Sequence, residues 1–137
     1  MRRTLFEPEH EFFRDTVRRC FETEFLPRNA EWEAAGEVSR EAWREMGRQG
    51  WLCTLIPEEY GGAGVDERYA AILLEEQYRL GLTGPGWSLH SDIIAYSASI
   101  IASSFNSWGR GQLRSQRRAL VLLCRPALHG AAPGRQH

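Results

Sequence analysis

The sequence has no lysine, so all 17 of its basic side chains are arginines, and it has no acidic residue after Asp92. No segment reaches the roughly 18 consecutive apolar residues that a membrane-spanning helix requires, and the first residues lack the apolar run of a signal peptide. The three cysteines, Cys20, Cys53 and Cys124, are odd in number and far apart, which fits neither a disulfide framework nor a metal site. We therefore expect a cytoplasmic protein without a membrane segment or a bound metal.

The charges that are present divide the chain into two parts. All 18 acidic residues lie at or before Asp92, whereas residues 93–137 carry six arginines and a cluster of serines. The net charge of -1 gives no global reason to expect nucleic-acid binding. A break this abrupt nevertheless separates segments of different character. We predict one domain over residues 1–95 and a basic, acid-free tail over residues 96–137.

The beginning of the chain has the pattern of an amphipathic helix. Pro8 suits the first turn of a helix, because its missing N–H would be unpaired there in any case. Apolar residues then recur in steps of four, which places them on one helix face; they are Phe13, Val17, Phe21 and Phe25. Pro27 predicts the end of this helix. We expect His10, near the helix start, to face solvent.

Start and stop signals predict four further helices. A short helix covers residues 29–35, and Ser39 and Asp66 are suitable N-caps for two longer helices. A last helix begins near Trp87. The glycines that end the first three of these helices are Gly36, Gly50 and Gly81. Because no alternating strand pattern of useful length occurs in the first part, we predict an all-α fold, an N-terminal helical bundle with an irregular or partly helical C-terminal tail.

A glycine-rich loop lies between two of these helices. Residues 57–65 read Pro-Glu-Glu-Tyr-Gly-Gly-Ala-Gly-Val. A phosphate-binding P-loop would end in Gly-Lys-Ser/Thr, whereas Gly64 is followed by valine and aspartate. Glu58 and Glu59 are adjacent, so they point in different directions and make a poor acid/base pair. The residues by themselves predict a shaped turn in which glycines permit positive φ.

The same loop resembles a signature of the acyl-CoA dehydrogenase family, Pro-x-x-Tyr/Phe-Gly-Gly-x-Gly, which lies in the N-terminal helical domain of those enzymes. Other motifs follow in the order of that family. They are the phenylalanine, arginine and valine pattern of residues 13–21, Trp-x-x-Met-Gly-x-x-Gly-Trp-Leu at 43–52, Leu-Glu-Glu at 74–76, and Gly-x-x-Trp-Ser-Leu-His at 84–90. The resemblance covers about residues 5–95.

The resemblance implies an FAD-dependent oxidation of the Cα–Cβ bond of an acyl-CoA thioester, with an electron-transfer flavoprotein as partner and a homo-oligomer at full length. In this family the start of the last predicted helix lines the end of the acyl-chain pocket. The candidate substrate-pocket residues are therefore Gly86, Trp87, His90 and Ser91. Trp87 and His90, three residues apart, would share a helix face, and their bulk would shorten the pocket. The alternative is a packed tryptophan and a hydrogen-bonded histidine within the bundle.

The chain departs from the family pattern after residue 95. It lacks the flavin-contacting Thr-Glu-Pro-x-x-Gly-Ser-Asp type of motif and the C-terminal helical domain that carries the catalytic glutamate. We therefore assign no catalytic, cofactor-binding or metal-binding residue, and expect this N-terminal fragment to be inactive alone. We hypothesise that the coding sequence was disrupted near residue 95 by a frameshift or rearrangement. A family-like continuation in another reading frame of the downstream DNA would support this hypothesis.

Two further functions fit the sequence. The helical part could be a non-catalytic interaction module, because a lone domain of this kind would expose apolar surface. The tail could bind nucleic acid through its basic and aromatic side chains, among them Phe105, Trp108, Arg110, Arg114, Arg117 and Arg118. Cys124 and His129 are two lone candidate ligands and fall short of a metal site.

Overall fold

The structure, a computed structural model, describes residues 5–106. This part of the chain consists of helices and connections and contains no strand, which confirms the predicted all-α class. No helix within it is long and apolar enough to cross a membrane. The predictions for the side chains of the tail beyond residue 106 lie outside the described residues. The described residues fall into two compact units, which are presented separately.

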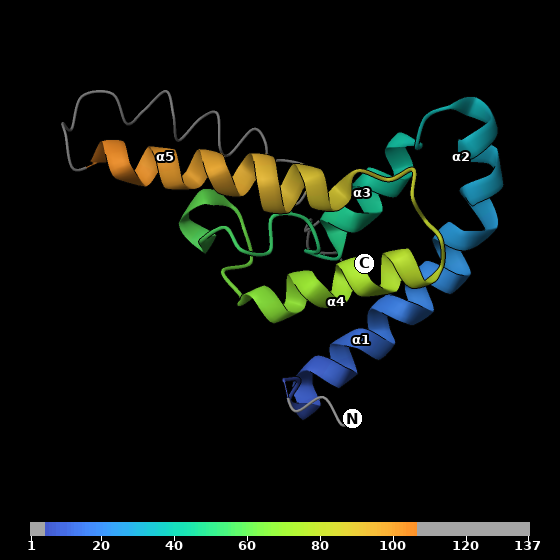
Figure 1. The fold of residues 1–137 in the computed structure, drawn as a ribbon, viewed down its shortest axis with the longest axis horizontal. Coiled ribbons are helices and arrows are strands. Elements are labelled where there is room, and N and C mark those ends of the chain that lie inside the picture. Colours follow the sequence, from blue (N-terminus) through green and yellow to red (C-terminus); the bar gives the residue numbers. More distant parts are fainter. Residues whose placement is uncertain (1–4, 107–137) are drawn as a thin grey trace, which may run out of the picture. The chain divides into compact units, whose positions relative to one another are not determined.

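The first unit comprises the described residues of Met1–Ser39 together with Asp66–Gly86. Its helical segments are α1 (Pro8–Cys20), the π-helical η1 (Phe21–Phe25), the 3₁₀ turn η2 (Leu26–Arg28), α2 (Asn29–Ala35) and α4 (Glu67–Arg79). Helices α1 and α4, blue and green in Figure 1, lie side by side. The first unit is therefore organised around this helix pair, although α1 and α4 are far apart in the sequence.

The predicted apolar stripe of the first helix forms the core of this unit. Val17, Phe21 and Phe25 are at most 1% exposed, and the Phe25 ring lies 6.1 Å from that of Trp32 in α2. The α-helix itself ends at Cys20, earlier than the stripe suggests, and continues as a π-helix. A step of four residues overshoots one α-helical turn of 3.6 residues, and the wider π turn offsets that drift. The π segment thus keeps the stripe on one face.

The local start and stop signals of the first unit are confirmed. Asp66 caps α4, its Oδ1 accepting a hydrogen bond of 2.9 Å from the backbone N–H of Arg68. Gly36 and Gly81 follow α2 and α4 with φ angles of 71° and 69°. A residue with a Cβ is strained in that left-handed region. Pro27 lies in the first positions of η2, where its missing N–H is tolerated.

The second unit comprises Arg40–Val65 and the described residues from Trp87 onwards. Its segments are α3 (Arg40–Arg48), the 3₁₀ turn η3 (Glu58–Tyr60), the π-helical η4 (Leu89–Ala95) and α5 (Tyr96–Asn106). A core cluster joins Cys53, Ile56 and Tyr60 to Ala95. The last helix begins at Trp87, as predicted, and runs through η4 into α5 without interruption. The boundary at residue 95 stays a prediction, and it coincides with the change from π- to α-helix.

Candidate functional site

The structure brings two of the four predicted pocket residues, Trp87 and His90, against one aromatic residue of α3. The Trp43 ring meets Trp87 edge-on, with 6.5 Å between ring centroids, and meets His90 in the same way at 5.6 Å. Edge-to-face contacts of this kind hold rings in a fixed relative orientation. Trp87 is buried and His90 is half-buried. Trp43 was not among the predicted site residues.

Ser91 completes this group, which we call the Trp43 cluster: Trp43, Trp87, His90 and Ser91. The Ser91 hydroxyl is buried and has no hydrogen-bond partner among the described residues. Residues three and four apart lie on the same helix face, so Ser91 and His90 lie on the same side of the helix as Trp87. Gly86 is half-buried and belongs to the first unit. A Cβ added at Gly86 would meet no atom within 4 Å.

The backbone around the Trp43 cluster is unusual. Residues Leu89–Ala95 form a π-helix, a rare geometry that occurs often at functional sites. Burial raises the pKa of Asp92, the next residue after Ser91, to about 6. The cluster therefore combines an aromatic wall, a buried hydroxyl and a carboxyl group that resists ionisation. These groups suit contact with an apolar ligand segment and include no nucleophile paired with a base.

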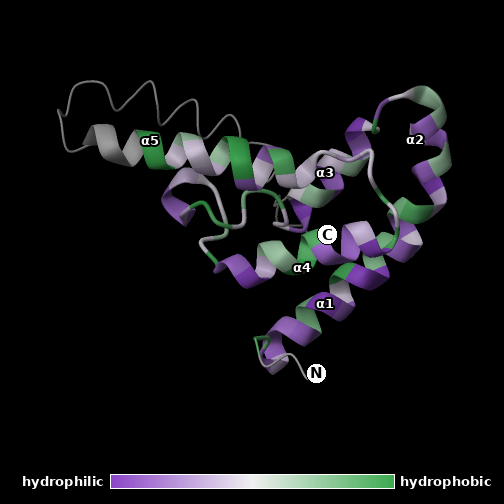
Figure 2. Cartoon of the chain, viewed as in Figure 1, coloured by the Kyte–Doolittle hydropathy of each residue, from purple (hydrophilic) through white to green (hydrophobic). Residues whose placement is uncertain are grey.

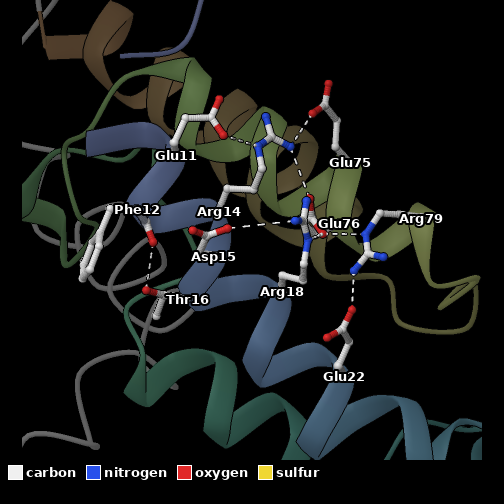
Figure 3. Close-up of polar contacts among 10 residues, drawn as sticks. All are labelled: Glu11, Phe12, Arg14, Asp15, Thr16, Arg18, Glu22, Glu75, Glu76 and Arg79. Atoms are coloured by element: carbon white, nitrogen blue, oxygen red, sulfur yellow. Dashed lines mark hydrogen bonds and ion pairs between the residues drawn. The ribbon is translucent and has the colours of Figure 1, made fainter. Parts of the chain in front are cut away.

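A second polar group lies between α1 and α4, as Figure 3 shows. The carboxylate of Glu76, 1% exposed, accepts hydrogen bonds from Arg14, Arg18 and Arg79 at 2.8 to 3.3 Å. Burial alone would raise the pKa of Glu76, but the hydrogen bonds from Arg18, Arg79 and Arg14 outweigh it and lower the pKa to about 2. Three guanidinium groups hold this carboxylate in its ionised form, so it cannot act as a base near neutral pH. Its role is structural, because it connects α1 to α4.

Sequence reasoning missed this network, although a signal was present. Glu76 of α4 is spaced three residues from Leu73 and four from Leu80, so it shares their helix face. A charge at such a position requires a partner when it is buried. Arg14 and Arg18 are spaced four apart on α1. Arg14 and Arg18 lie 62 and 58 residues before Glu76 in the sequence, so a pattern within one helix does not indicate that they pair with it.

The prediction that His10 faces solvent is wrong. His10 is fully buried, with the Tyr69 ring 4.7 Å away. Its Nδ1 accepts a hydrogen bond of 3.2 Å from the backbone N–H of Glu7, and the Glu7 side chain accepts one from the backbone of His10. This reciprocal arrangement is a capping box with histidine in place of glutamate or glutamine. Packing of α1 on α4 covers the imidazole, a tertiary effect that its position near the helix start does not indicate.

The capping box also accounts for a candidate cation site. Glu7, Glu9 and His10 offer ligand atoms within 4.8 Å of one another. These groups surround the N-terminus of α1, where the helix dipole favours negative charge and opposes a cation. The two carboxylates thus complement the dipole, and the histidine serves the cap. We assign no metal ion to this group.

The glycine-rich loop is a self-contained turn, as its residues predict. The backbone N–H groups of Gly61, Gly62 and Gly64 donate to the carbonyls of Glu58, Pro57 and Ile56. A Cβ at Gly62 would overlap the backbone oxygen of Ile56, so the loop closes against the preceding residues. A phosphate cradle needs backbone N–H groups that point outward. The donors of these glycines are already used within the loop.

Comparison with known proteins identifies the family of this all-helical domain. The family described as "Acyl-CoA dehydrogenase, N-terminal domain" matches residues 7–104. The long-chain specific acyl-CoA dehydrogenase of Sus scrofa, named as mitochondrial, is 53% identical over 92 residues, 67% of this chain and 21% of that protein. A "3-(aryl)acrylate reductase" of Clostridium sporogenes is 34% identical over 72 residues, 53% of this chain and 19% of that protein.

A solved structure agrees with these sequence matches. The crystal structure of acyl-CoA dehydrogenase from Geobacillus kaustophilus superposes with a TM-score of 0.70 at 28% identity, covering 90% of this chain and 30% of that one. The fold is thus that of the helical N-terminal domain. The chain belongs to the acyl-CoA dehydrogenase family, as its motifs indicate. It spans about a fifth of the length of the Sus scrofa and Clostridium sporogenes relatives.

Proposed function

We propose that this chain is the N-terminal helical part of an FAD-dependent acyl-CoA dehydrogenase and does not oxidise a substrate by itself. The match to the family over residues 7–104 carries this proposal. Neither the interaction module nor the nucleic-acid binder is favoured by a comparison. In the complete enzyme, FAD would accept the hydride from the acyl chain, while protein groups orient the substrate.

Neither the glycine loop nor the group of arginines around Glu76 fits the pyrophosphate of FAD. A flavin dinucleotide carries a pyrophosphate that proteins bind with outward-pointing backbone N–H groups or cationic side chains. The glycine loop uses its donors internally, and Arg14, Arg18 and Arg79 are engaged by Glu76. We therefore derive no step of the reaction through flavin on this chain.

The Trp43 cluster and Gly86 are the substrate-facing residues in our proposal. The aromatic rings of Trp43 and Trp87, together with half-buried His90, would form the end wall of the pocket for the acyl chain. Gly86 belongs to the first unit and stays a proposed pocket residue on the family resemblance alone. A bulky end wall restricts the length or branching of the acyl group, since each added methylene requires space and contributes only about 0.8 kcal/mol.

Spectroscopy and dye reduction test the first proposal. The purified chain should show no flavin absorbance and no dye reduction with acyl-CoA substrates of graded length. Flavin that copurifies, or turnover by the chain alone, would contradict the proposal. Binding to DNA or RNA that weakens with added salt would favour the nucleic-acid function instead.

A chimaera tests the pocket. Residues 7–95 would replace the matching segment of the Mus musculus long-chain specific acyl-CoA dehydrogenase, which is 50% identical over 92 residues. Trp87→Ala in this chimaera should shift the preferred acyl chain towards greater length. Trp32→Ala, a buried tryptophan of the first unit, is the matched control and should leave the preference unchanged. Equal preferences in all three proteins would refute the assignment of Trp87.

The remaining family properties are also proposals. A complete enzyme of this kind would pass electrons to an electron-transfer flavoprotein and assemble as a homo-oligomer. We propose a cytoplasmic location because the three cysteines are odd in number and far apart, which fits no disulfide framework. The Sus scrofa relative is named as mitochondrial. Fractionation of cells that express the chain distinguishes the two compartments.

A further inference from the structure

The side chain of His10 lies between the first turns of two helices in the first unit. It is the third residue of α1, and its Nε2 lies 3.8 Å from Oδ2 of Asp66, the N-cap of α4. Figure 2 shows hydrophilic positions, in purple, at the starts of both helices. Because the imidazole is fully buried, any change in its charge acts directly on both helix starts.

The hydrogen bonds of His10 define one neutral form of its ring. Nδ1 accepts the hydrogen bond of 3.2 Å from the backbone N–H of Glu7, and an accepting ring nitrogen carries no proton. The ring proton therefore lies on Nε2, which faces the carboxylate of Asp66. Among the described residues, Nε2 has no hydrogen-bond partner. One ring nitrogen thus serves the cap of α1, and the other lies close to an acidic group of α4.

The groups around the ring have opposing effects on a charged imidazole. Glu7 and Glu9 offer carboxylate oxygens within 4.8 Å of a ring nitrogen, and Asp66 faces the ring from α4. These three carboxylates favour the charged form, whereas burial and the positive ends of the two helix dipoles oppose it. Arg68 opposes it as well, because its guanidinium already binds Asp66 at 2.7 Å and Glu7 at 3.3 Å.

Two further polar side chains lie near the imidazole. The ring of Tyr69 is 4.7 Å away, and burial raises the pKa of this tyrosine, so its hydroxyl stays neutral near neutral pH. Arg14 lies over the ring of Phe6, which is 6.2 Å from the imidazole. The guanidinium of Arg14 is bound by Glu75 and Glu76. The ring nitrogens of His10 therefore face three carboxylates and the arginine that links two of them.

We propose that His10 is a pH-dependent cap for the start of α1. Protonation places a second N–H on Nδ1, which then faces the N–H of Glu7, and two donors cannot form a hydrogen bond with each other. The cap is lost, whereas the Nε2–H gains a stronger attraction to the carboxylate of Asp66. Neutral His10 thus closes the first turn of α1, and charged His10 opens it while staying next to α4. The proposal is independent of the enzymatic function proposed above.

Arg68 limits the extent of the opening. Its Nη1 contacts Oε1 of Glu7 at 3.3 Å and the backbone oxygen of Leu5 at 3.4 Å. These contacts do not involve the imidazole, so they keep residues 5–7 close to α4 in both charge states. The backbone N–H of Glu7, in contrast, donates to the imidazole. This N–H is therefore the group that reports the charge of His10.

Nuclear magnetic resonance of the full chain tests this proposal. At pH 8 the ¹⁵N chemical shifts of the His10 ring should show a protonated Nε2 and an unprotonated Nδ1. Between pH 8 and pH 5, where histidines change charge, the Glu7 amide should lose about tenfold of its protection from hydrogen exchange, after correction for the intrinsic pH dependence. The amide of Arg68 is the internal control. It should stay protected, because hydrogen bonds from Arg68 hold the pKa of its acceptor, Asp66, below the usual range.

Two substitutions separate the proposed cap from a general effect of acid. His10→Gln keeps an acceptor that is usual in a capping box and does not titrate, so the Glu7 amide should be equally protected at both pH values. His90→Gln, at the other histidine that the structure describes, is the matched control and should retain the loss at pH 5.

The native chain decides the outcome even where His10→Gln does not fold. A proton on Nδ1 at pH 8, or equal protection of the Glu7 amide at pH 8 and pH 5, would overturn the proposal. A loss of protection at pH 5 that persists in folded His10→Gln would overturn it as well, because the loss would then have another origin.

Discussion

Arg18 holds Glu76 with two hydrogen bonds, 3.0 Å from Nε and 2.8 Å from Nη2, across 58 residues of sequence. A paired contact between guanidinium and carboxylate fixes both distance and orientation. The same carboxylate is bound by Arg14 and Arg79. Glu76 thus sets how α1 and α4 lie against each other in the first unit.

Replacing Glu76 should destabilise the first unit strongly. Glu76→Gln removes the buried charge and leaves three guanidinium groups without their shared partner, which we expect to cost about 3 kcal/mol of unfolding free energy. Urea denaturation measures this loss. Glu75→Gln is the matched control, because Glu75 is more exposed than Glu76 and its carboxylate contacts Arg14 at 2.7 Å. It should cost less than about 1 kcal/mol, and equal losses would contradict a central role for Glu76.

The stability of the chain should fall in acid because of the same residue. The pKa of Glu76 is lowered from 4.5 to about 2 in the folded chain, so below pH 4.5 the unfolded chain binds a proton that the folded chain does not. The stabilisation is complete above the unfolded pKa and is lost as the pH falls towards 2. Urea denaturation between pH 6 and pH 2, in the native chain and in Glu76→Gln, should show a shallower acid loss in the variant. Parallel curves would contradict this origin.

Asp92 should have the opposite effect. Burial raises its pKa from 3.8 to about 6, so between these values the unfolded chain ionises first and stability falls as the pH rises. Asp92→Asn removes this loss and should raise the unfolding free energy at pH 7 by about 1 to 2 kcal/mol. The variant should resemble the native chain at pH 3, where both states are protonated. A uniform effect at all pH values would contradict this explanation.

The glycine loop should tolerate no side chain at Gly62. A Cβ there would overlap the backbone oxygen of Ile56 and approach that of Cys53, so the loop must move away from the core cluster. We expect Gly62→Ala to cost about 2 to 3 kcal/mol, as in other overpacked sites. Gly86→Ala, with no atom within 4 Å of the added carbon, is the control and should change stability by less than about 0.5 kcal/mol. Thermal denaturation of both variants makes the comparison.

Much of the fold was readable from local patterns. The stripe Val17, Phe21 and Phe25, the cap Asp66 and the glycine stops Gly36 and Gly81 all lie where the sequence predicts them. Each of these signals acts over a single helical turn, so neighbouring residues suffice to define it. The π segments were not predicted, because no local propensity distinguishes them from α-helix.

The candidate site was predictable only in part. Trp87 and His90 follow from the family resemblance, whereas Trp43 joins them from a different helix. The substrate role of Gly86, Trp87, His90 and Ser91 stays a prediction. Contacts between helices depend on tertiary packing, and a pattern within one helix does not name its partner.

The amino-acid sequence was enough to predict the helices and their ends, because hydrogen bonds and caps within a helix depend on residues a few positions apart. It was also enough to predict the family, because the motifs occur in the order typical of that family. It was not enough to predict that His10 is buried or that Glu76 is bound by three arginines. Both outcomes follow from the packing of α1 against α4, which brings side chains about 60 residues apart into contact. Burial between the two helices removes water from the polar side chains, which therefore need hydrogen-bond partners from the protein. Local helix propensity does not indicate this requirement.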